Sequence, residues 1–153
     1  MKGKLQSLLS RGNYTLPIRG YSANVQSMQV EGRHQTRAEI YLRCSREGAS
    51  WPTSHFPTEV RIVAAPIADY DRTSDDQLML GLIRCDQPDH TVIWLLAQES
   101  YAAQALALLN HGTDGLVLSI ETHRKVEEWG GDEFIPVLSF SVARKSAYAA
   151  DET

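Results

Sequence analysis

The sequence predicts a mostly β domain with one α-helix, and three observations predict it. Several segments alternate between apolar and polar residues with a period of two, as strands do. A single segment has the three- and four-residue spacing that is typical of an amphipathic helix. Gly, Pro, Asn and Asp fall between these segments, where turns are expected. A chain of 153 residues fits one domain, so we expect a single domain over residues 1–145 and a polar tail at 146–153.

The clearest predicted strand spans residues 36–44. Its apolar side chains are Ala38, Ile40, Leu42 and Cys44, and they alternate with Arg37, Glu39, Tyr41 and Arg43. We therefore expect one face of this strand on a core and the other in water. Further strands are predicted at 60–65, 78–83, 91–97, 116–125 and 134–143, with an irregular β segment at 14–30.

The predicted helix spans residues 99–110. Its apolar stripe consists of Ala102, Ala105, Leu106 and Leu109. Ser100 is the expected N-cap, and Gly112 stands where a helix commonly ends. A second, short helix is predicted near the N-terminus, because Leu5, Leu8 and Leu9 share one helical face.

Composition excludes several classes of protein. Hydrophobic residues make up 42% of the chain, which is enough for a core. No run of about 18 apolar residues is present, so no membrane span is expected. The N-terminus lacks the apolar core of a signal peptide, and a cytoplasmic location is the default expectation. Two cysteines do not make a disulfide framework.

Charge is distributed unevenly along the chain. Residues 1–61 contain nine Lys or Arg and four Glu, a balance of +5, whereas residues 62–153 contain six Lys or Arg and fifteen Asp or Glu, a balance of −9. Such asymmetry favours one face that meets an anionic partner. The alternative interpretation is chance clustering on a solvated surface.

The C-terminal third carries a recognisable succession of elements. In order, these are a strand with Trp94, the helix 99–110, Gly112, a strand that ends at Arg124 and Lys125, the turn 129–132 with Trp129, and the strand 134–143. This unit resembles the second half of the bacterial single-stranded DNA-binding proteins, which are OB-fold barrels. In that family a Trp-bearing strand leads into an Ala- and Leu-rich helix, and a basic loop with a Trp precedes the closing strand.

The resemblance implies an OB-like small β-barrel. Residues 46–89 exceed the short connection of the family and contain two apolar stretches, so we expect an inserted hairpin there. The implied function is non-catalytic binding of single-stranded DNA, or RNA, in replication, recombination or mobile-element maintenance. Members of this kind assemble as dimers or tetramers, so a homo-oligomer is expected, and no cofactor is implied.

Six residues are the candidates for contact with nucleic acid. Arg37, Arg43, Arg124 and Lys125 would contact phosphates, and bases would stack on Tyr41 and Trp129. Each has an ordinary structural alternative, such as a surface ion pair for the two arginines beside Glu39, or packing over a hairpin for Trp129. Trp94 lies in a strongly apolar strand and is expected in the core.

The sequence gives little support for catalysis or for a metal site. The sequence has no nucleophile elbow, no phosphate-binding glycine loop and no dinucleotide-binding motif, so no enzyme is expected. Cys85, Asp86, Asp89 and His90 have metal-ligand types but not the spacing of a zinc site. Two alternatives to nucleic-acid binding remain: a protein-interaction or adaptor domain, marked by an exposed apolar patch, and a small-ligand-binding protein, marked by a closed apolar pocket.

Overall fold

A computed structural model describes residues 12–52, 56–87 and 90–145. The short helix predicted near residues 5–9 and the tail 146–153 lie outside these residues. The strands are β1 (Asn13–Val30), β2 (Arg33–Cys44), β3 (Pro57–Ala64), β4 (Gly81–Gln87), β5 (His90–Ala97), β6 (Leu116–Thr122), β7 (Glu127–Trp129) and β8 (Asp132–Arg144). One α-helix, α2 (Glu99–Asn110), and a 3₁₀ turn, η1 (Ile67–Asp69), accompany them. The predicted mostly β architecture with one helix is confirmed.

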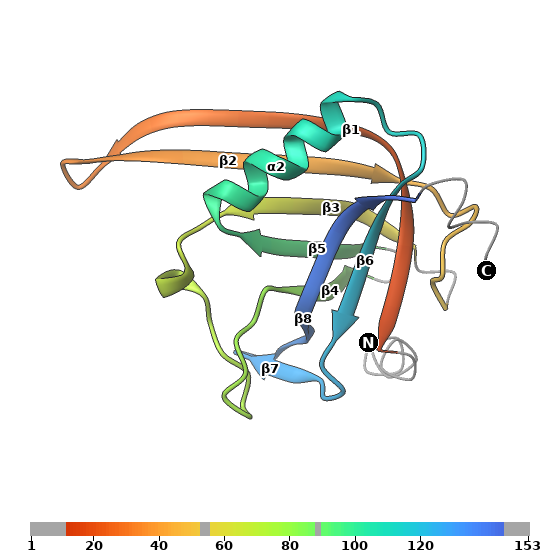
Figure 1. Cartoon of the computed structure of the whole chain (residues 1–153). Coiled ribbons are helices and arrows are strands. Elements are labelled where there is room, and N and C mark those ends of the chain that lie inside the picture. The colour runs from red at the N-terminus through yellow and green to blue at the C-terminus, as the bar shows by residue number, and fades with distance from the viewer. Residues whose placement is uncertain (1–11, 53–55, 88–89, 146–153) are drawn as a thin grey trace.

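The strands form a small barrel. They follow the order β4-β5-β3-β2-β1-β6-β8-β7, and an additional pairing of β4 with β8 closes a ring of seven strands, with β7 outside it (Figure 1). All neighbouring strands are antiparallel except β3 and β5, which run parallel. Closure removes most of the unpaired edges that an open sheet of this size would expose.

The barrel is OB-like and is widened by the residues between β2 and β5. When β3 and β4 are set aside, β1, β2, β5, β8 and β6 follow one another around the ring, and α2 connects β5 to β6. This is the five-stranded Greek-key order 1-2-3-5-4 of an OB barrel. The inserted segment supplies two strands, but they do not form the expected hairpin: β3 lies between β2 and β5, and β4 lies between β5 and β8.

The core fills the barrel with alternate side chains from each strand. Its fully buried members are led by Tyr14, Leu16, Ile18, Ile40, Ile62, Ile83, Ile93, Leu95, Leu109 and Leu116. The inward face of β2 is the predicted one, because Ile40 and Leu42 are buried. Helix α2 contributes Ala102, Ala105 and Leu109, as its apolar stripe predicts.

The predicted bounds of helix 99–110 are confirmed, but its predicted N-cap and the start of one strand are wrong. Ser100 is not the N-cap, because α2 begins at Glu99 and Gln98 occupies the cap position without a side-chain hydrogen bond. The strand predicted at residues 78–83 begins only at Gly81. Gly81 has a φ of 142° and lies so close to the Trp94 carbonyl that a Cβ atom would collide with it, so the chain changes course there.

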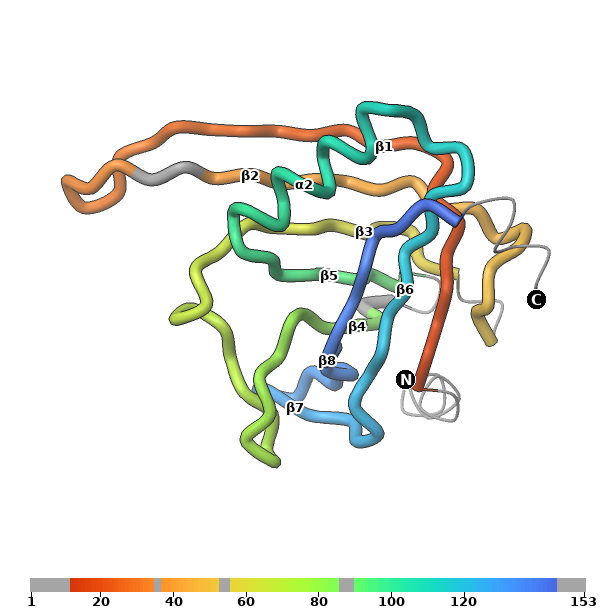
Figure 2. Tube along the Cα trace, viewed as in Figure 1, coloured from red at the N-terminus to blue at the C-terminus, as the bar shows by residue number. Residues whose placement is uncertain are grey.

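The hairpin of β1 and β2 extends well beyond the barrel (Figure 2). Only residues 13–17 of β1 pair with β6, whereas β1 and β2 stay paired out to Val30 and Arg33. Glu31 and Gly32 both have positive φ and form the turn at the tip. We call residues 22–37 the arm.

Candidate nucleic-acid interface

The outer face of β2, β3, β5 and β4 carries aromatic rings and arginines. On β3 and β5 the inward residues Ile62 and Ile93 are fully buried, and their neighbours Arg61 and Trp94 point to the opposite side because side chains alternate along a strand. Tyr41 is opposite Arg61 across β2 and β3, and Arg61 is opposite Trp94 across β3 and β5. Trp94 therefore lies on the outer face, and its expected place in the core is wrong.

These side chains form one continuous row across four strands. The Arg61 guanidinium carbon lies 5.8 Å from the centre of the Tyr41 ring and 5.0 Å from that of the Trp94 ring. Arg84, on β4, stacks on Trp94 at 4.5 Å. We call Tyr41, Arg61, Trp94 and Arg84 the cation–π row. Contacts of this length stabilise the positions of both the cations and the rings.

Two glutamates hold the row in place. Trp94 Nε1 donates a hydrogen bond of 2.6 Å to Glu59 Oε2. Glu39 Oε1 accepts from Arg37 Nε at 3.0 Å, and Glu39 Oε2 accepts from the Tyr41 hydroxyl at 3.1 Å. Burial raises the pKa of the Glu39 carboxyl, but the hydrogen bonds from Tyr41 and Arg37 and the charges of Arg37 and Arg61 outweigh it, so the pKa lies below its ordinary value.

Arg61 is partly exposed at the centre of the row, with 23% of its side-chain surface accessible. Its Nη1 donates to the Tyr41 hydroxyl over 3.4 Å and lies 3.9 Å from Glu39 Oε1. Its buried Nε has no hydrogen-bond partner among the described residues. Because Nε is buried, Arg61 can meet an anion only through its terminal nitrogens.

Arg37 and Arg43, on β2, share this outer side with Tyr41. Arg37 forms the ion pair with Glu39 at 2.7 Å, which is the ordinary alternative considered for it. Arg43 is exposed and lies flat against β1, where a Cβ atom at Gly20 would collide with its guanidinium group. The outer face thus carries the arginines 37, 43, 61 and 84 against the glutamates 39 and 59.

The second group of predicted residues lies elsewhere. Arg124 and Lys125 follow β6, and Trp129 ends β7, which Figure 1 places at the opposite end of the barrel from β2. Trp129 is 47% exposed, and its ring packs on Phe134 with 4.4 Å between centres. Arg124 packs over Gly12. The structure therefore separates the six predicted residues into two groups of three.

Lys125 takes part in docking a loop. Its Nζ lies 3.2 Å from Asp75 Oδ1, and His123 Nε2 lies 3.0 Å from Asp75 Oδ2. The backbone N–H of Lys125 donates to His123 Nδ1, so the neutral ring carries its proton on Nε2 and donates to Asp75. The hydrogen bond from Lys125 is the main cause that lowers the pKa of Asp75. Ser74 and Glu127 add two further hydrogen bonds to the same contact.

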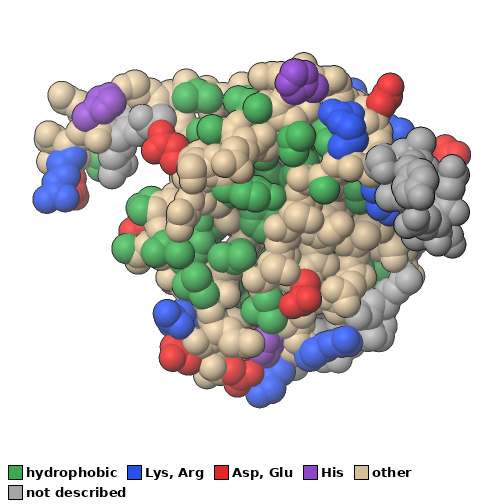
Figure 3. All heavy atoms as spheres, viewed as in Figure 1, with side chains coloured by type: hydrophobic (Ala, Val, Ile, Leu, Met, Phe, Trp, Pro, Cys, Tyr) green, Lys and Arg blue, Asp and Glu red, His purple; other side chains and the backbone are tan. Residues whose placement is uncertain are grey.

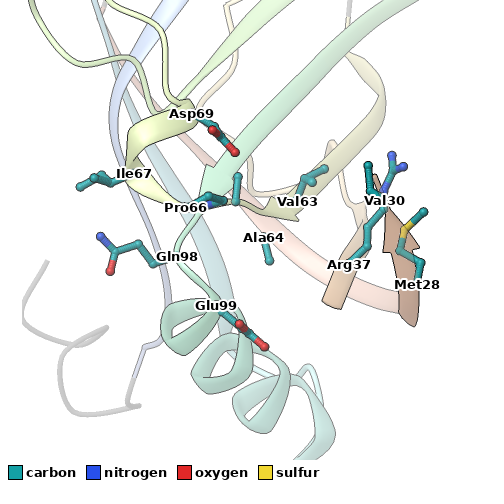
Figure 4. A pocket seen from close by; sticks show the side chains of 11 residues that line it. Met28, Val30, Arg37, Val63, Ala64, Pro66, Ile67, Asp69, Gln98 and Glu99 are labelled. Carbon is teal, nitrogen blue, oxygen red and sulfur yellow. The ribbon is translucent and has the colours of Figure 1, made fainter. Parts of the chain in front are cut away.

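A groove lies under the arm, and Arg37 of β2 is one of the residues that line it. It has a volume of about 750 Å³. Its floor is apolar, with Val63, Ala64, Ala65 and Pro66, and it is bordered by Met28, Val30, Ile67, Asp69, Gln98 and Glu99 (Figure 4). Most of the bordering residues are exposed, so this is an open groove rather than the closed pocket of a small-ligand site.

Cys85 and His90, the two candidate metal ligands whose side chains the structure describes, form separate contacts. Cys85 is buried and approaches Thr91 Oγ1 at 3.4 Å, whereas His90 is exposed and bonds Thr58 at 2.9 Å. Over the described ranges, no three His, Cys, Asp or Glu side chains gather in a way that would hold a metal ion. Likewise, no helix in the described part of the chain has both the length and the apolarity needed to cross a membrane.

Sequence reasoning missed Arg61, Arg84 and Trp94 as members of this surface. Each lies in a mainly apolar segment. The available signal is that Arg61 alternates with the apolar residues Val60 and Ile62, which places it on the opposite face of the strand. Comparisons with family models, with curated proteins and with solved structures found no match for this chain.

Proposed function

We propose that this protein binds single-stranded nucleic acid, without catalysis, on the outer face of β2, β3, β5 and β4. The observation that carries the proposal is the cation–π row, which alternates ring and guanidinium across four neighbouring strands. Proteins that hold single strands combine a cationic path for the backbone with planar groups on which bases stack. The row supplies both on one surface of an OB-like barrel, a fold whose equivalent face is used for oligonucleotides.

Phosphate contact is assigned first to the arginines. The guanidinium carbons of Arg61 and Arg84 lie 5.0 Å and 4.5 Å from the centre of the Trp94 ring, and the Arg61 side chain keeps 23% of its surface exposed. A preorganised guanidinium loses little side-chain entropy when it binds a phosphate. Arg37 and Arg43 extend the cationic path along β2.

Base stacking is assigned to the same row. Bases stack on guanidinium planes as well as on aromatic rings, so Tyr41, Arg61 and Trp94 form a continuous platform. A base–aromatic stack contributes about 1–3 kcal/mol. Asp69 and Glu99 repel phosphate at the groove under the arm, which favours a path of the backbone along the row rather than into the groove.

A fluorescence-anisotropy titration of labelled oligothymidylate tests the proposal. The wild-type protein is titrated at several salt concentrations, and we expect binding that weakens steeply as salt increases, because phosphate contacts release counterions. Arg61→Gln and Arg84→Gln should each weaken binding and reduce the salt slope by about 1. Far-UV circular dichroism checks that each variant is folded.

Arg72→Gln is the matched control. Arg72 is exposed, pairs with Asp76 and lies on the loop before β4, so its loss removes the same charge away from the row. No binding by the wild type at low salt contradicts the proposal. Equal losses for Arg72→Gln and Arg61→Gln would reduce the interaction to general electrostatic attraction.

Trp129→Ala decides whether the second group of residues takes part. A loss of affinity for this variant would extend the bound strand to the loop with Arg124 and Lys125. Unchanged affinity would confine the interface to the outer face and leave Trp129 as a ring that packs on Phe134.

A further inference from the structure

Strand β2 has an open edge where it runs beyond β3. It pairs with β1 along its whole length, but with β3 only over residues 39–42. Strand β3 ends at Ala64, and the chain then leaves the sheet toward η1. Residues 33–38 therefore have no neighbour on the β3 side, and the described residues provide no backbone hydrogen bond to them there. Alternate residues of such a strand direct their N–H and C=O groups outward, so the edge presents about 20 Å of unpaired backbone.

The groove under the arm follows this edge. Its floor is formed by residues 63–66, which are the end of β3 and the residues after it. Val63 pairs with Glu39, so the line of β3, continued past its end, runs beside residues 33–38. The volume of about 750 Å³ lies within the range of ordinary ligand sites. The groove thus has room where one further strand would complete the sheet.

Apolar side chains border the groove on both sides. Met28 and Val30 belong to the arm, and Ile67 belongs to η1 (Figure 4). Val30 and Ile67 are two of the four large hydrophobic residues that the described chain exposes. In the space-filling view, hydrophobic side chains gather below the arm, and the surface is hollowed between them and the arm (Figure 3). An extended peptide in the groove would place alternate side chains against these residues.

The charge of the groove is negative. Asp69 and Glu99 border it, and both are exposed and form no ion pair with the described residues. Figure 4 shows both carboxylates turned toward the side on which the arm lies. The one cation of the lining, Arg37, is compensated by Glu39 at 2.7 Å. The groove therefore attracts a Lys or Arg side chain and repels phosphate.

We propose that the groove under the arm binds an extended peptide segment of a partner protein, which adds as a strand to residues 33–38 of β2. The backbone hydrogen bonds of such an addition supply affinity, and pockets for alternate side chains supply specificity. The segment has apolar side chains for the floor and a Lys or Arg for Asp69 and Glu99. None of the four residues of the cation–π row lines the groove, so the peptide site does not depend on the proposed nucleic-acid binding.

Selection from a peptide library tests the proposal. Random linear peptides of about seven residues, the length of an ordinary strand, are displayed on phage and selected on the full chain. We expect enriched sequences with apolar residues at alternate positions and at least one Lys or Arg. A selection that enriches no peptide, or that enriches acidic ones, overturns the proposal.

Alternate N-methylation of an enriched peptide tests strand addition directly. The N–H groups of successive residues in a strand point to opposite sides. Methyl groups on one set of alternate amides should therefore weaken binding at least about tenfold. Methyl groups on the other set should leave the affinity within about threefold, because that side of the peptide faces water. Equal effects of the two sets would show that the peptide does not pair as a strand.

Charge-removing substitutions locate the basic residue of the peptide. Asp69→Asn and Glu99→Gln should each weaken peptide binding about threefold, as exposed ion pairs do when they are lost. Asp76→Asn is the matched control, because Asp76 lies on the loop after η1 with 86% of its side chain exposed and does not line the groove. Equal affinities for all three variants would contradict the assignment to the groove.

Removal of an apolar border residue provides a second pair of variants. Ile67→Ser should weaken peptide binding at least about threefold, because it takes apolar surface from the site. Val25→Ser is its control: Val25 is equally exposed, but alternation along β1 places it on the face of the arm opposite to Met28 and Val30. Both side chains are exposed, so neither substitution should unfold the protein. A larger loss for Val25→Ser would place the peptide on the other face.

Hydrogen exchange identifies the occupant of the edge. Outward-facing amides of residues 33–38 should exchange at least about tenfold more slowly when an enriched peptide saturates the protein. Protection by oligothymidylate in place of the peptide would assign the edge to nucleic acid. Protection that increases with protein concentration alone would assign it to a second copy, and protection at every concentration to the chain itself. Each of these three results overturns the proposal.

Discussion

Glu39 shows how one residue organises the outer face. It stands between Arg37 and Tyr41 on β2 and is contacted by both, with Arg61 reaching it from β3. These contacts leave the carboxylate buried but satisfied, which is the condition for a stable charge away from water. Glu39 thereby positions both the first ring and the first stacked cation of the row.

The lowered pKa of Glu39 predicts a pH dependence of stability. Because the folded-state pKa lies below the ordinary value of 4.5, the ionised form stabilises the fold. This contribution is complete above the unfolded-state pKa and is lost as the pH falls through the folded-state pKa. We expect the free energy of unfolding to decrease between about pH 5 and pH 3, and Glu39→Gln to decrease it less over that range.

Urea denaturation of both proteins at a series of pH values measures this effect. Glu128→Gln, on the exposed strand β7, corrects for the loss of one carboxyl group in general. A pH profile of Glu39→Gln that parallels the wild type would show that Glu39 gains nothing from its neighbours.

Cys44 illustrates the opposite case, a thiol that burial makes unreactive. Burial raises the pKa of Cys44 to about 12 from an ordinary value of 9.0. The thiolate is the reactive form, so the native protein should alkylate at Cys44 about a thousandfold more slowly than the unfolded chain at pH 8. Iodoacetamide labelling followed by peptide mass spectrometry measures each cysteine separately. Rapid labelling of Cys44 in the native state would contradict the prediction.

At the scale of elements, a side chain from β8 caps the C-terminal end of α2. Arg144 donates to the carbonyl oxygens of Leu108 at 3.3 Å, of Gly112 at 2.7 Å and of Asp114. The last carbonyls of a helix have no partner within the helix, and a cation there also interacts favourably with the helix dipole. Arg144 thus joins the end of α2 to the closing strand of the barrel.

Removal of this cap should have a measurable cost. We expect Arg144→Met to lower the free energy of unfolding by about 1–2 kcal/mol, because three carbonyl groups lose a charged donor. Lys145→Met is the control, since Lys145 is the next residue and is also exposed. Equal melting temperatures for the two variants in thermal circular dichroism would rule out the capping role.

The periodicity of the sequence predicts the helix and the strands, but it does not predict which strands pair with one another or in what register. The alternation in residues 36–44 predicts β2 and its inward face, and the stripe of Ala102, Ala105 and Leu109 predicts α2 to the residue. These signals lie within a few consecutive residues. The cation–π row instead depends on the register of β3 against β2 and β5, which joins residues that are 20 and 33 positions apart. No local pattern specifies such a pairing.

The same reason explains the misplaced aromatic residue. Trp94 is surrounded by apolar residues in its strand, and apolar neighbours normally indicate a core position. Its outward position depends on Arg61 and Arg84, which contact it from the neighbouring strands. Two arginines and Glu59 contact the indole, so this side chain is partly buried although it lies on the outer face.

At the scale of the whole molecule, the insertion and the row are connected. Tyr41 and Trp94 stand on β2 and β5, which belong to the five-stranded OB-like order, and Arg61 and Arg84 stand on the inserted strands β3 and β4. Each inserted strand therefore adds one arginine next to a ring. The wider barrel increases the outer face and supplies half of the groups on which the proposed function depends.

Because of the insertion, the barrel is closed by the pairing of β4 with β8, which we call the seam. These strands pair only through Leu82 with Pro136 and Ile83 with Ile135, the shortest pairing in the ring of seven. Both isoleucines are fully buried. Because a closed barrel needs this contact, the packing of Ile83 on Ile135 should be coupled to the stability of the whole domain.

A double-mutant cycle tests the seam. Ile83→Ala and Ile135→Ala should each lower the free energy of unfolding by about 2–5 kcal/mol, as buried isoleucines do. Neighbouring residues are not additive, so the double variant should depart from the sum by about 0.5–3 kcal/mol. Ile18 is equally buried but pairs with Cys44 between β1 and β2, so Ile18→Ala combined with Ile83→Ala should be additive.

Urea unfolding followed by tryptophan fluorescence and by circular dichroism measures all variants, and coincident curves are expected because one closed barrel unfolds as one unit. Additive effects of Ile83→Ala and Ile135→Ala, or two separate unfolding transitions in the wild type, would contradict the prediction. The pairing of β4 with β8 would then not be coupled to the stability of the whole domain.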